Sequence, residues 1–345
     1  MIPISTSVRF QLIDERLSDA ENTLTLDELC SFTSVSKSGY YYWRNHKDIR
    51  DEREEKDRAD FSLILDVYKH KGYKKGARQI HMALLHLDNP VVMNVKKIRR
   101  LMHKYGLECP IRKVNPYRKM MKATRENRVS PNLLDRRFNE YGPRKVFLTD
   151  ITYIPFYGNY DQKRFVYLSV MMDACTKEVL GYQVSNTLQE EFVLETVRQV
   201  LRAPGVTTSG ICLVHSDQGV HYTSVEFRNL LKHKGILQSM SRKGNCWDNA
   251  PQESFFGHMK DDLNDRLVRC RSFYQVKDEI DQWITYYNKE RYQWRLAKLA
   301  PAEYYSFLTT GQYPLKTEPV PEIPEWNDIS KLKANNKKCA EQATA

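Results

Sequence analysis

The sequence predicts an α/β protein in which a mixed β-sheet flanked by helices follows small all-helical domains. From Val146 onward, three consecutive β-like runs are succeeded by alternating helical and strand patterns. Before Val146, apolar residues recur instead at helical spacing. A length of 345 residues suggests two or three domains, and 41% apolar with 28% charged residues is typical of a globular protein.

The first domain, residues 1–60, is predicted to contain two short helices within residues 24–45. Leu26 and Leu29 have helical spacing, Ser34 interrupts the pattern, and Ser36 can cap a second helix that carries Trp43. Two adjacent helices are a helix-turn-helix candidate. They are more often plain architecture, so this pattern alone does not indicate DNA binding.

Residues 61–107 predict a second helical unit with three apolar stripes. Pro90 ends the second helix and Asn94 can cap the third. The third helix turns four basic residues away from its apolar stripe, as a helix that docks in the major groove would. These candidate DNA contacts are Lys96, Lys97, Arg99 and Arg100. An ordinary solvated helix face is the alternative interpretation.

Positive charge is concentrated in the middle of the chain. Residues 61–145 hold 21 Lys and Arg against 6 Asp and Glu, while the whole chain has a net charge of +11. Residues 108–143 are predicted to be an extended basic linker that could follow a phosphate backbone. The alternatives are a well-solvated surface and a segment without structure until it binds a partner.

The predicted sheet belongs to a domain that spans residues 144–264. Its strands are the runs VFLTDITYIPF, RFVYLSVMMDA, EVLGYQVSN, ICLVHSD and ILQSMS, and helices are expected at 190–202, 225–234 and 251–264. This order matches a ribonuclease-H-like core. A helical extension is expected at 265–313, followed by a proline-rich and disordered tail at 314–345.

Three acidic residues of this domain stand where a functional carboxylate is expected. Asp150 lies inside an apolar strand, where a carboxylate is costly without a partner. Asp217 follows a strand at a tight turn, and Glu253 lies in the first turn of a helix. Each has an ordinary explanation as well: local hydrogen bonds for Asp150, turn chemistry for Asp217 and the helix dipole for Glu253.

Lys260 shares one helical face with Glu253, so a cation follows the carboxylate by two turns. Three carboxylates suit Mg²⁺ or Mn²⁺, because these hard ions prefer oxygen ligands. Two such ions, roughly 3.5 to 4 Å apart, can activate a nucleophile and stabilise the leaving oxygen at one phosphate. Asp173, Asp248 and Asp261 are interpreted instead as structural carboxylates, Asp173 at a turn and Asp248 as a helix cap.

The strings LTDITYIPF, HSDQGVHYTS and GNCWDNAPQESFFGHMK resemble the DDE transposase core of bacterial insertion sequences. They are most similar to the second-frame product of the insertion sequence three family, a relative of retroviral integrases. Thirty-five residues lie between Asp217 and Glu253, and Lys260 follows seven residues after Glu253, as that family has them. The segments SVSKSGYYYW, KKIRRLMHKYGL and YYNKERYQWRLAKLAPAEY extend the resemblance over most of the chain.

The resemblance implies an enzyme that binds terminal inverted repeats and cuts and joins DNA. Asp150, Asp217 and Glu253 would hold two Mg²⁺ or Mn²⁺ ions, and the product would be a circularised element that is later inserted elsewhere. Lys260 and Arg291 would contact DNA. The implied partners are double-stranded DNA, further copies of the chain and a helix-turn-helix and leucine-zipper protein from an upstream frame. Phe147, Val220, His221, Trp247 and Trp294 depart from residues common in the family.

Other features narrow the interpretation. The seven cysteines include no Cys-x-x-Cys pair, so we expect reduced thiols and no zinc finger. No apolar run is long enough for a membrane span and no signal pattern opens the chain, so a cytoplasmic, nucleoid-associated protein is expected. The rival functions are a non-catalytic DNA-binding regulator derived from a transposase and a nuclease that cuts without joining.

Overall fold

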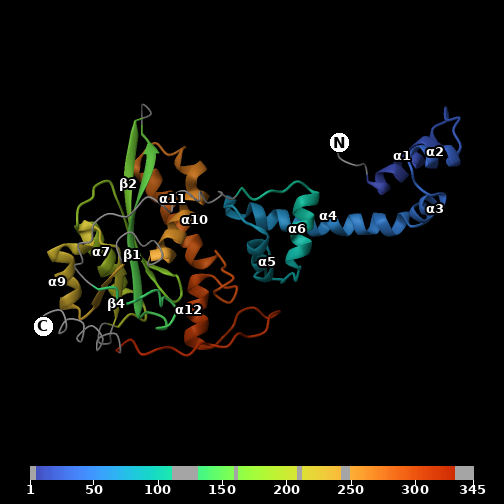
Figure 1. Ribbon diagram of the computed structural model, residues 1–345. Coiled ribbons are helices and arrows are strands. Elements are labelled where there is room, and N and C mark those ends of the chain that lie inside the picture. Colours follow the sequence, from blue (N-terminus) through green and yellow to red (C-terminus); the bar gives the residue numbers. More distant parts are fainter. Residues whose placement is uncertain (1–4, 111–130, 159–161, 208–211, 242–248, 331–345) are drawn as a thin grey trace.

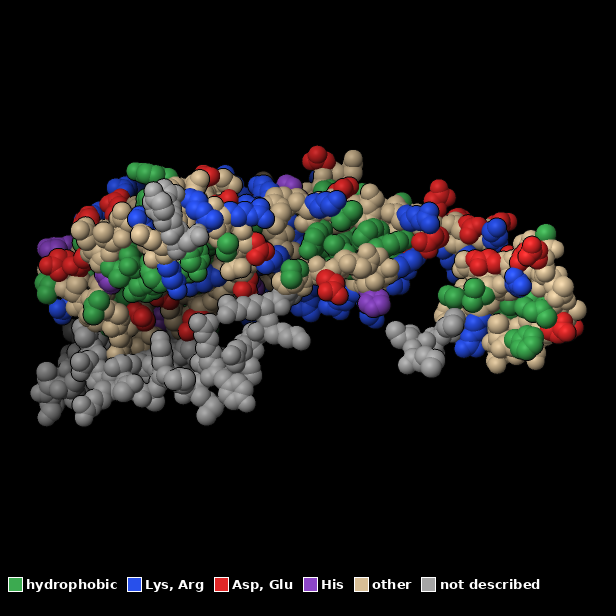
Figure 2. All heavy atoms as spheres, turned by 90° about the horizontal axis from the view of Figure 1, so that it is seen from above, with side chains coloured by type: hydrophobic (Ala, Val, Ile, Leu, Met, Phe, Trp, Pro, Cys, Tyr) green, Lys and Arg blue, Asp and Glu red, His purple; other side chains and the backbone are tan. Residues whose placement is uncertain are grey.

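The computed structural model describes residues 5–110, 131–158, 162–207, 212–241 and 249–330. Three parts follow one another along an elongated molecule: a small helical domain, a middle helical unit and a larger lobe built on a sheet (Figure 1). Seen from above, Lys and Arg side chains border hydrophobic ones on the middle unit (Figure 2). No described helix is both long and apolar enough to cross a membrane. All five cysteines in the described ranges are unpaired.

The small N-terminal domain contains α1 (Thr6–Ser18), α2 (Leu26–Phe32) and α3 (Lys37–Asn45). The sequence predicted the last two helices, and the cap at Ser36 is confirmed because its hydroxyl accepts a hydrogen bond from the amide of Gly39 at 3.1 Å. Helix α1 was not predicted. It packs on the other two through Phe10 and Ile13, around the fully buried ring of Tyr40.

The middle unit consists of α4 (Lys47–Lys69), the short 3₁₀ turn η1 (His70–Gly72), α5 (Ala77–Leu85) and α6 (Val95–Lys104). The three predicted apolar stripes form its core. Asn94 caps α6 as predicted, because its side-chain oxygen accepts from the amide of Lys96 at 2.8 Å. Helix α4 runs without a break through the expected domain boundary at 60/61. Residues 111–130 of the expected linker lie outside the described residues.

The sheet has five strands: β1 (Val146–Tyr157), β2 (Lys163–Asp173), β3 (Val179–Ser185), β4 (Leu213–Ser216) and β5 (Leu237–Met240). Their order is β3-β2-β1-β4-β5. The first three strands form an antiparallel meander, and β4 and β5 run parallel to β1. This is the mixed sheet and the ribonuclease-H-like arrangement that the sequence predicted.

Helices cover both faces of the sheet. One apolar core lies between the sheet and α7 (Glu191–Arg202), α8 (Val220–Thr223) and α9 (Val225–His233). The other core lies against α10 (Ala250–Leu267) and α11 (Phe273–Lys289). Alternate side chains of β1 therefore point into different cores, with Phe147 in the first and Leu148 in the second.

The chain after α11 connects the middle unit to the sheet domain. Phe307 of α12 (Pro301–Thr310) and the preceding Leu299 pack in one cluster with Leu85 of α5. Glu290 pairs with both His70 and Lys71 of η1. The middle unit is thus held to the sheet domain by apolar and charged contacts together.

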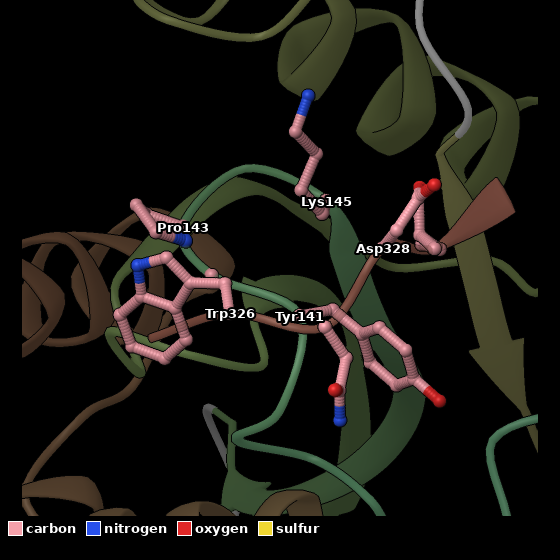
Figure 3. Close-up of a pocket in the computed structure, with 8 residues that line it drawn as sticks. Tyr141, Pro143, Lys145, Trp326 and Asp328 are labelled. Atoms are coloured by element: carbon pink, nitrogen blue, oxygen red, sulfur yellow. The ribbon is translucent and has the colours of Figure 1, made fainter. Parts of the chain in front are cut away.

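The tail that follows α12 is extended, as its prolines predicted, but up to residue 330 it packs on the sheet domain. Ile329 is buried in the main core, and the amide of Asn327 donates to the carbonyl of Glu140 at 2.7 Å. Trp326 lies over Gly142 and, with Tyr141, Lys145 and Asp328, borders a cavity of about 300 Å³ (Figure 3). Residues 314–330 are therefore held by packing on the sheet domain, and the rest of the expected tail lies outside the described residues.

Candidate functional site

Asp150 and Asp217 stand on neighbouring strands at the same register offset. Strand β1 pairs with β4 through Leu148, which lies opposite His215. Asp150 follows Leu148 by two residues within β1, and Asp217 follows His215 by two residues, immediately after β4. Because parallel strands lie roughly 5 Å apart, the two backbones bring these carboxylates to one edge of the sheet.

A turn fixes the side chain of Asp217. One carboxylate oxygen accepts a hydrogen bond from the amide of Gly219 at 2.8 Å. A methyl group at Gly219 would lie 2.8 Å from that same oxygen, closer than real contacts of this kind. Gly219 therefore leaves the room that the observed position of the Asp217 carboxylate requires.

Helix α10 brings the third carboxylate to the same region. Gln252 anchors the helix, because its amide donates to the backbone carbonyl of Leu148 at 2.6 Å. Asn249 is the N-cap residue of α10, yet its side chain donates to Asp150 at 3.0 Å instead of capping the helix. Glu253 follows in the first turn and is exposed.

The charges of these residues act on one another. Burial raises the pKa of Asp150 to about 7, with further increases from the negative charges of Asp217 and Glu253. Burial, followed by the negative charges of Asp150 and Asp217, also raises the pKa of the buried Tyr222 hydroxyl. This hydroxyl lies 3.4 Å from the hydroxyl of Thr149. The three predicted acidic residues thus form one negative region at the edge of the sheet.

The donor set fits a divalent cation. Asp150, Asp217 and Glu253 offer only carboxylate oxygens, which Mg²⁺ and Mn²⁺ prefer. The side-chain oxygen of Asn249 is buried and finds no hydrogen-bond partner among the described residues. Within the same ranges, however, no three His, Cys, Asp or Glu side chains lie close enough together to hold an ion.

Sequence reasoning missed Asn249, Gly219 and Tyr222 as parts of this region. Asn249 precedes Glu253 by four residues and so shares its helical face, which is the signal that could have identified it. The side chain of Tyr222 comes from a short helix after Asp217, and no periodic pattern predicts its contact with Thr149.

Lys260 lies on α10, half-buried and seven residues after Glu253. The structural interpretation of Asp173 is consistent with its contacts: it is fully buried, accepts from the amide of Cys175 at 2.9 Å, and pairs with Arg144 at 3.2 Å. Asp248 lies outside the described residues.

Helix α6 presents its basic residues in two groups. Arg100 forms two hydrogen bonds of 2.7 Å with Asp57 of α4, and Lys97 pairs with Asp60. Lys104 continues this row of ion pairs with Glu54 at 2.5 Å. Hydrogen bonds from Arg100 and Lys104 hold the pKa of Asp57 well below its usual range.

Lys96 and Arg99 are the remaining two candidates on α6. Both are exposed, and they lie on one helical face with His103. Because Lys97 and Arg100 pair with acidic residues of α4, fewer basic side chains of α6 are available to a partner than the sequence indicated. Arg291 is in neither group: its side chain is only 11% exposed and its Nε lies 3.8 Å from a carboxylate oxygen of Asp262, which favours a structural role.

Family comparisons agree with this division of the chain. An integrase core domain matches residues 140–246, and a second integrase core description matches residues 234–301. An HTH-like domain matches residues 54–114, which include α4, α5 and α6. The integrase core matches therefore cover all three acidic candidates.

Similar proteins come from bacterial insertion sequences. InsK of insertion sequence element IS150 from Escherichia coli K12, named as a transposase, is 31% identical over 84% of this chain and 96% of its own length. The transposase for insertion sequence element IS904 of Lactococcus lactis is 32% identical over 69% of this chain and 89% of its own. Transposase InsF of insertion sequence IS3A from E. coli is 25% identical over 75% and 88%.

Among solved structures, the HTLV-2 integrase catalytic core domain in complex with magnesium is 16% identical and aligns with 47% of this chain and 97% of its own. The TM-score of that alignment is 0.37. The fold assignment accordingly rests on the strand order and on the integrase core match.

Proposed function

Because the chain belongs to the IS3 family of insertion-sequence transposases, we propose that Asp150, Asp217 and Glu253 hold two divalent metal ions at a site that cuts and joins DNA. The observation that carries this proposal is that β1 and β4 place Asp150 and Asp217 side by side, while Gln252 anchors the first turn of α10, with Glu253, to β1. Burial, followed by the charges of Asp217 and Glu253, raises the pKa of Asp150 to about 7. A carboxylate in such surroundings gains most from a cation.

The residues of the chain have distinct parts in this proposal. Two Mg²⁺ or Mn²⁺ ions, when bound, would activate the attacking oxygen and stabilise the leaving oxygen at one phosphate. The Asn249 amide orients the Asp150 carboxylate, and the Gly219 amide orients that of Asp217. Lys260, two turns beyond Glu253, would hold a neighbouring phosphate group.

The reaction would proceed in two phosphoryl transfers. In the first, the oxygen of a water molecule forms a bond to phosphorus and the bond to the 3′-oxygen of the element end breaks, which leaves a 3′-hydroxyl. In the second, that hydroxyl attacks another phosphate and displaces its 3′-oxygen. In each step one P–O bond forms as another breaks. The first converts a phosphodiester into a phosphomonoester and a 3′-hydroxyl, and the second exchanges one phosphodiester for another and releases a 3′-hydroxyl, so neither requires an oxidant or an energy-rich cofactor.

The substrate would be double-stranded DNA that carries the terminal inverted repeats of the element. The exposed face of α6 with Lys96 and Arg99 follows the turn after α5, which suits insertion into a major groove. An element has two ends, and each end needs an active site. We therefore propose that at least two copies of the chain act together on DNA.

The test is strand cleavage of a labelled duplex that contains an element end, with Mg²⁺ present. Glu253→Gln should reduce cleavage at least 100-fold, since one of three ligands is lost. Glu226→Gln is the matched control, because Glu226 is an exposed acidic residue in the first turn of α9. Near-normal cleavage by Glu253→Gln would overturn the assignment. Labelled products longer than the substrate strand would distinguish joining from cutting alone.

A further inference from the structure

The hairpin formed by β1 and β2 has one face that no helix covers at its far end. Tyr153, Tyr157 and Phe165 are 50%, 41% and 43% exposed there, which is high for rings on a sheet. The register pairs Tyr153 with Tyr167, Pro155 with Phe165 and Tyr157 with Lys163. Because these positions alternate along the strands, all of them lie on the same face. This aromatic face consists of Tyr153, Pro155, Tyr157, Lys163, Phe165 and Tyr167.

The rings are held in place by one another. Tyr167 is half-buried and meets Tyr153 edge to face, with ring centroids 5.2 Å apart. The ammonium group of Lys163 lies 5.4 Å from the ring centroid of Phe165. Such contacts hold the rings in one orientation in the absence of a ligand. The protein side chains would therefore lose little conformational entropy when a flat ligand stacks on them.

The surroundings of this aromatic face are basic. Lys163 lies on the face itself, whereas the exposed Arg164 pairs with Phe156 and so points to the opposite face of the same hairpin. Arg271 is exposed between α10 and α11, and one of its guanidinium nitrogens lies 3.5 Å from the carbonyl of Tyr157. No Asp or Glu occurs in residues 151–157 or 162–169. Exposed aromatic rings among cations are suited to nucleobases and phosphates, because rings stack on bases while the cations neutralise the backbone.

The aromatic face lies on the strand that carries the candidate active site. Tyr153 follows Asp150 by three residues, a separation of about 10 Å along a strand. Strand β4 pairs with β1 only at Val146 to Leu148, so beyond this point that edge of β1 has no partner strand among the described residues. A DNA strand could therefore pass from Asp150 around this open edge to the aromatic face.

We propose that this aromatic face binds unpaired bases of a DNA strand next to the active site, by stacking on Tyr153 and Phe165. The inference rests on the proposed function in one respect, namely that the substrate is DNA. A second copy of the chain is a poorer occupant. Two such faces meeting about a twofold axis would place the Lys163 ammonium group of each copy within the apolar contact, where it would be desolvated without an acidic partner from residues 151–157 or 162–169.

The experiment measures binding of the full chain to two labelled single strands of about 12 nucleotides in EDTA, where no cleavage occurs. One strand is oligothymidylate, and the other has the same backbone charge without bases. Fluorescence anisotropy should give an affinity for oligothymidylate about tenfold higher than for the abasic strand. In the variant Tyr153→Ala/Phe165→Ala, affinity for oligothymidylate should fall to that of the abasic strand, while abasic binding is unchanged.

Conservative variants separate stacking from folding. Tyr153→Phe should keep the affinity, whereas Tyr153→Leu, which retains apolar bulk without a ring face, should lose most of the contribution of that residue. Tyr274→Ala removes a ring of α11 that is 79% exposed and should have no effect. The melting temperature of each variant, followed by circular dichroism, identifies any that fail to fold.

Equal affinity of the unmodified chain for the two strands would overturn this inference, and so would unchanged oligothymidylate binding in the double variant. A third contrary outcome is that the double variant sediments at a different rate from the unmodified chain while its DNA binding is unchanged. The last result would instead assign the face to a second copy. Because the measurement is made in EDTA, it requires neither bound metal nor a working active site. Failure of the proposed catalysis would therefore leave this measurement unaffected.

Discussion

Asp217 lies beside Asp150 because the register that pairs Leu148 with His215 continues for two more residues on each chain segment. The charge of Asp217, after burial, is the largest cause that raises the pKa of Asp150 to about 7. A folded protein that keeps two carboxylates together in this way loses stability at neutral pH, and this has measurable consequences.

Removing the charge of Asp150 should stabilise the metal-free protein. A carboxyl whose pKa is raised in the folded state is protonated there up to about pH 7, whereas in the unfolded chain it ionises near pH 4. Folding therefore becomes less favourable as pH rises between these values, by about 4 kcal/mol at most. Asp150→Asn should melt at a higher temperature than the unmodified chain at pH 8 in EDTA, and this advantage should vanish below about pH 4.

Mg²⁺ should reverse that order. The ion should raise the melting temperature of the unmodified chain and have less effect on Asp150→Asn. Glu226→Gln serves as a control for the loss of an exposed acidic residue that is not a proposed ligand. A lower melting temperature of Asp150→Asn at pH 8 in EDTA would contradict the charge argument.

Gly219→Ala should reduce Mg²⁺-dependent strand cleavage without unfolding the protein. The added methyl would meet the Asp217 carboxylate at 2.8 Å, and the side chain would have to move. Displacement of a catalytic group by a fraction of an ångström to 1 Å costs about 10- to 100-fold in rate. Gly76→Ala is the control, since its methyl meets nothing within 4 Å. Full activity of Gly219→Ala would mean that the observed position of Asp217 is not the active one.

Arg99→Ala and Arg100→Ala should differ although the residues are adjacent. Arg99 is exposed on the open face of α6, so its loss should weaken DNA binding and lower the salt slope of the binding constant by about 1, with little change in melting temperature. Arg100 makes two hydrogen bonds to Asp57, so its loss should lower the melting temperature as well. Salt-dependent anisotropy and thermal melting of both variants check this, and identical behaviour in both measurements would refute the division.

Truncation after residue 313 should destabilise the sheet domain, whereas truncation after residue 330 should not. The shorter chain loses the buried Ile329 from the core of the sheet domain and the buried Leu315 from the cluster with Phe307 of α12, and each contributes about 1.5 to 3 kcal/mol. It also lacks Trp326, whose ring packs against Gly142, a glycine with φ of +70°. Thermal unfolding of the two truncated chains gives the answer. Equal melting temperatures would show that the tail packs on the domain without stabilising it.

Much of the fold followed from local patterns. The alternation of apolar residues in residues 146–185 predicted the meander, and Ser36 and Asn94 were recognised as helix caps because capping depends on residues three positions apart or fewer. Helix α1 was missed, since its apolar residues are sparse and it becomes stable only by packing on Tyr40. The packed tail was missed for the same reason: its few apolar residues acquire a partner only when the core exists.

By itself, the sequence indicated three candidate carboxylates and placed them in a strand, just after a strand and in the first turn of a helix, as the structure also has them. Only the tertiary structure decided that Asn249 turns from its helix to Asp150, that Lys97 and Arg100 are engaged with α4, and that Arg291 lies inside near Asp262. The physical reason is that caps, strands and helices are set by neighbours in the chain. The pairing of charged side chains depends instead on how segments distant in the sequence pack together, and local sequence patterns do not predict that packing.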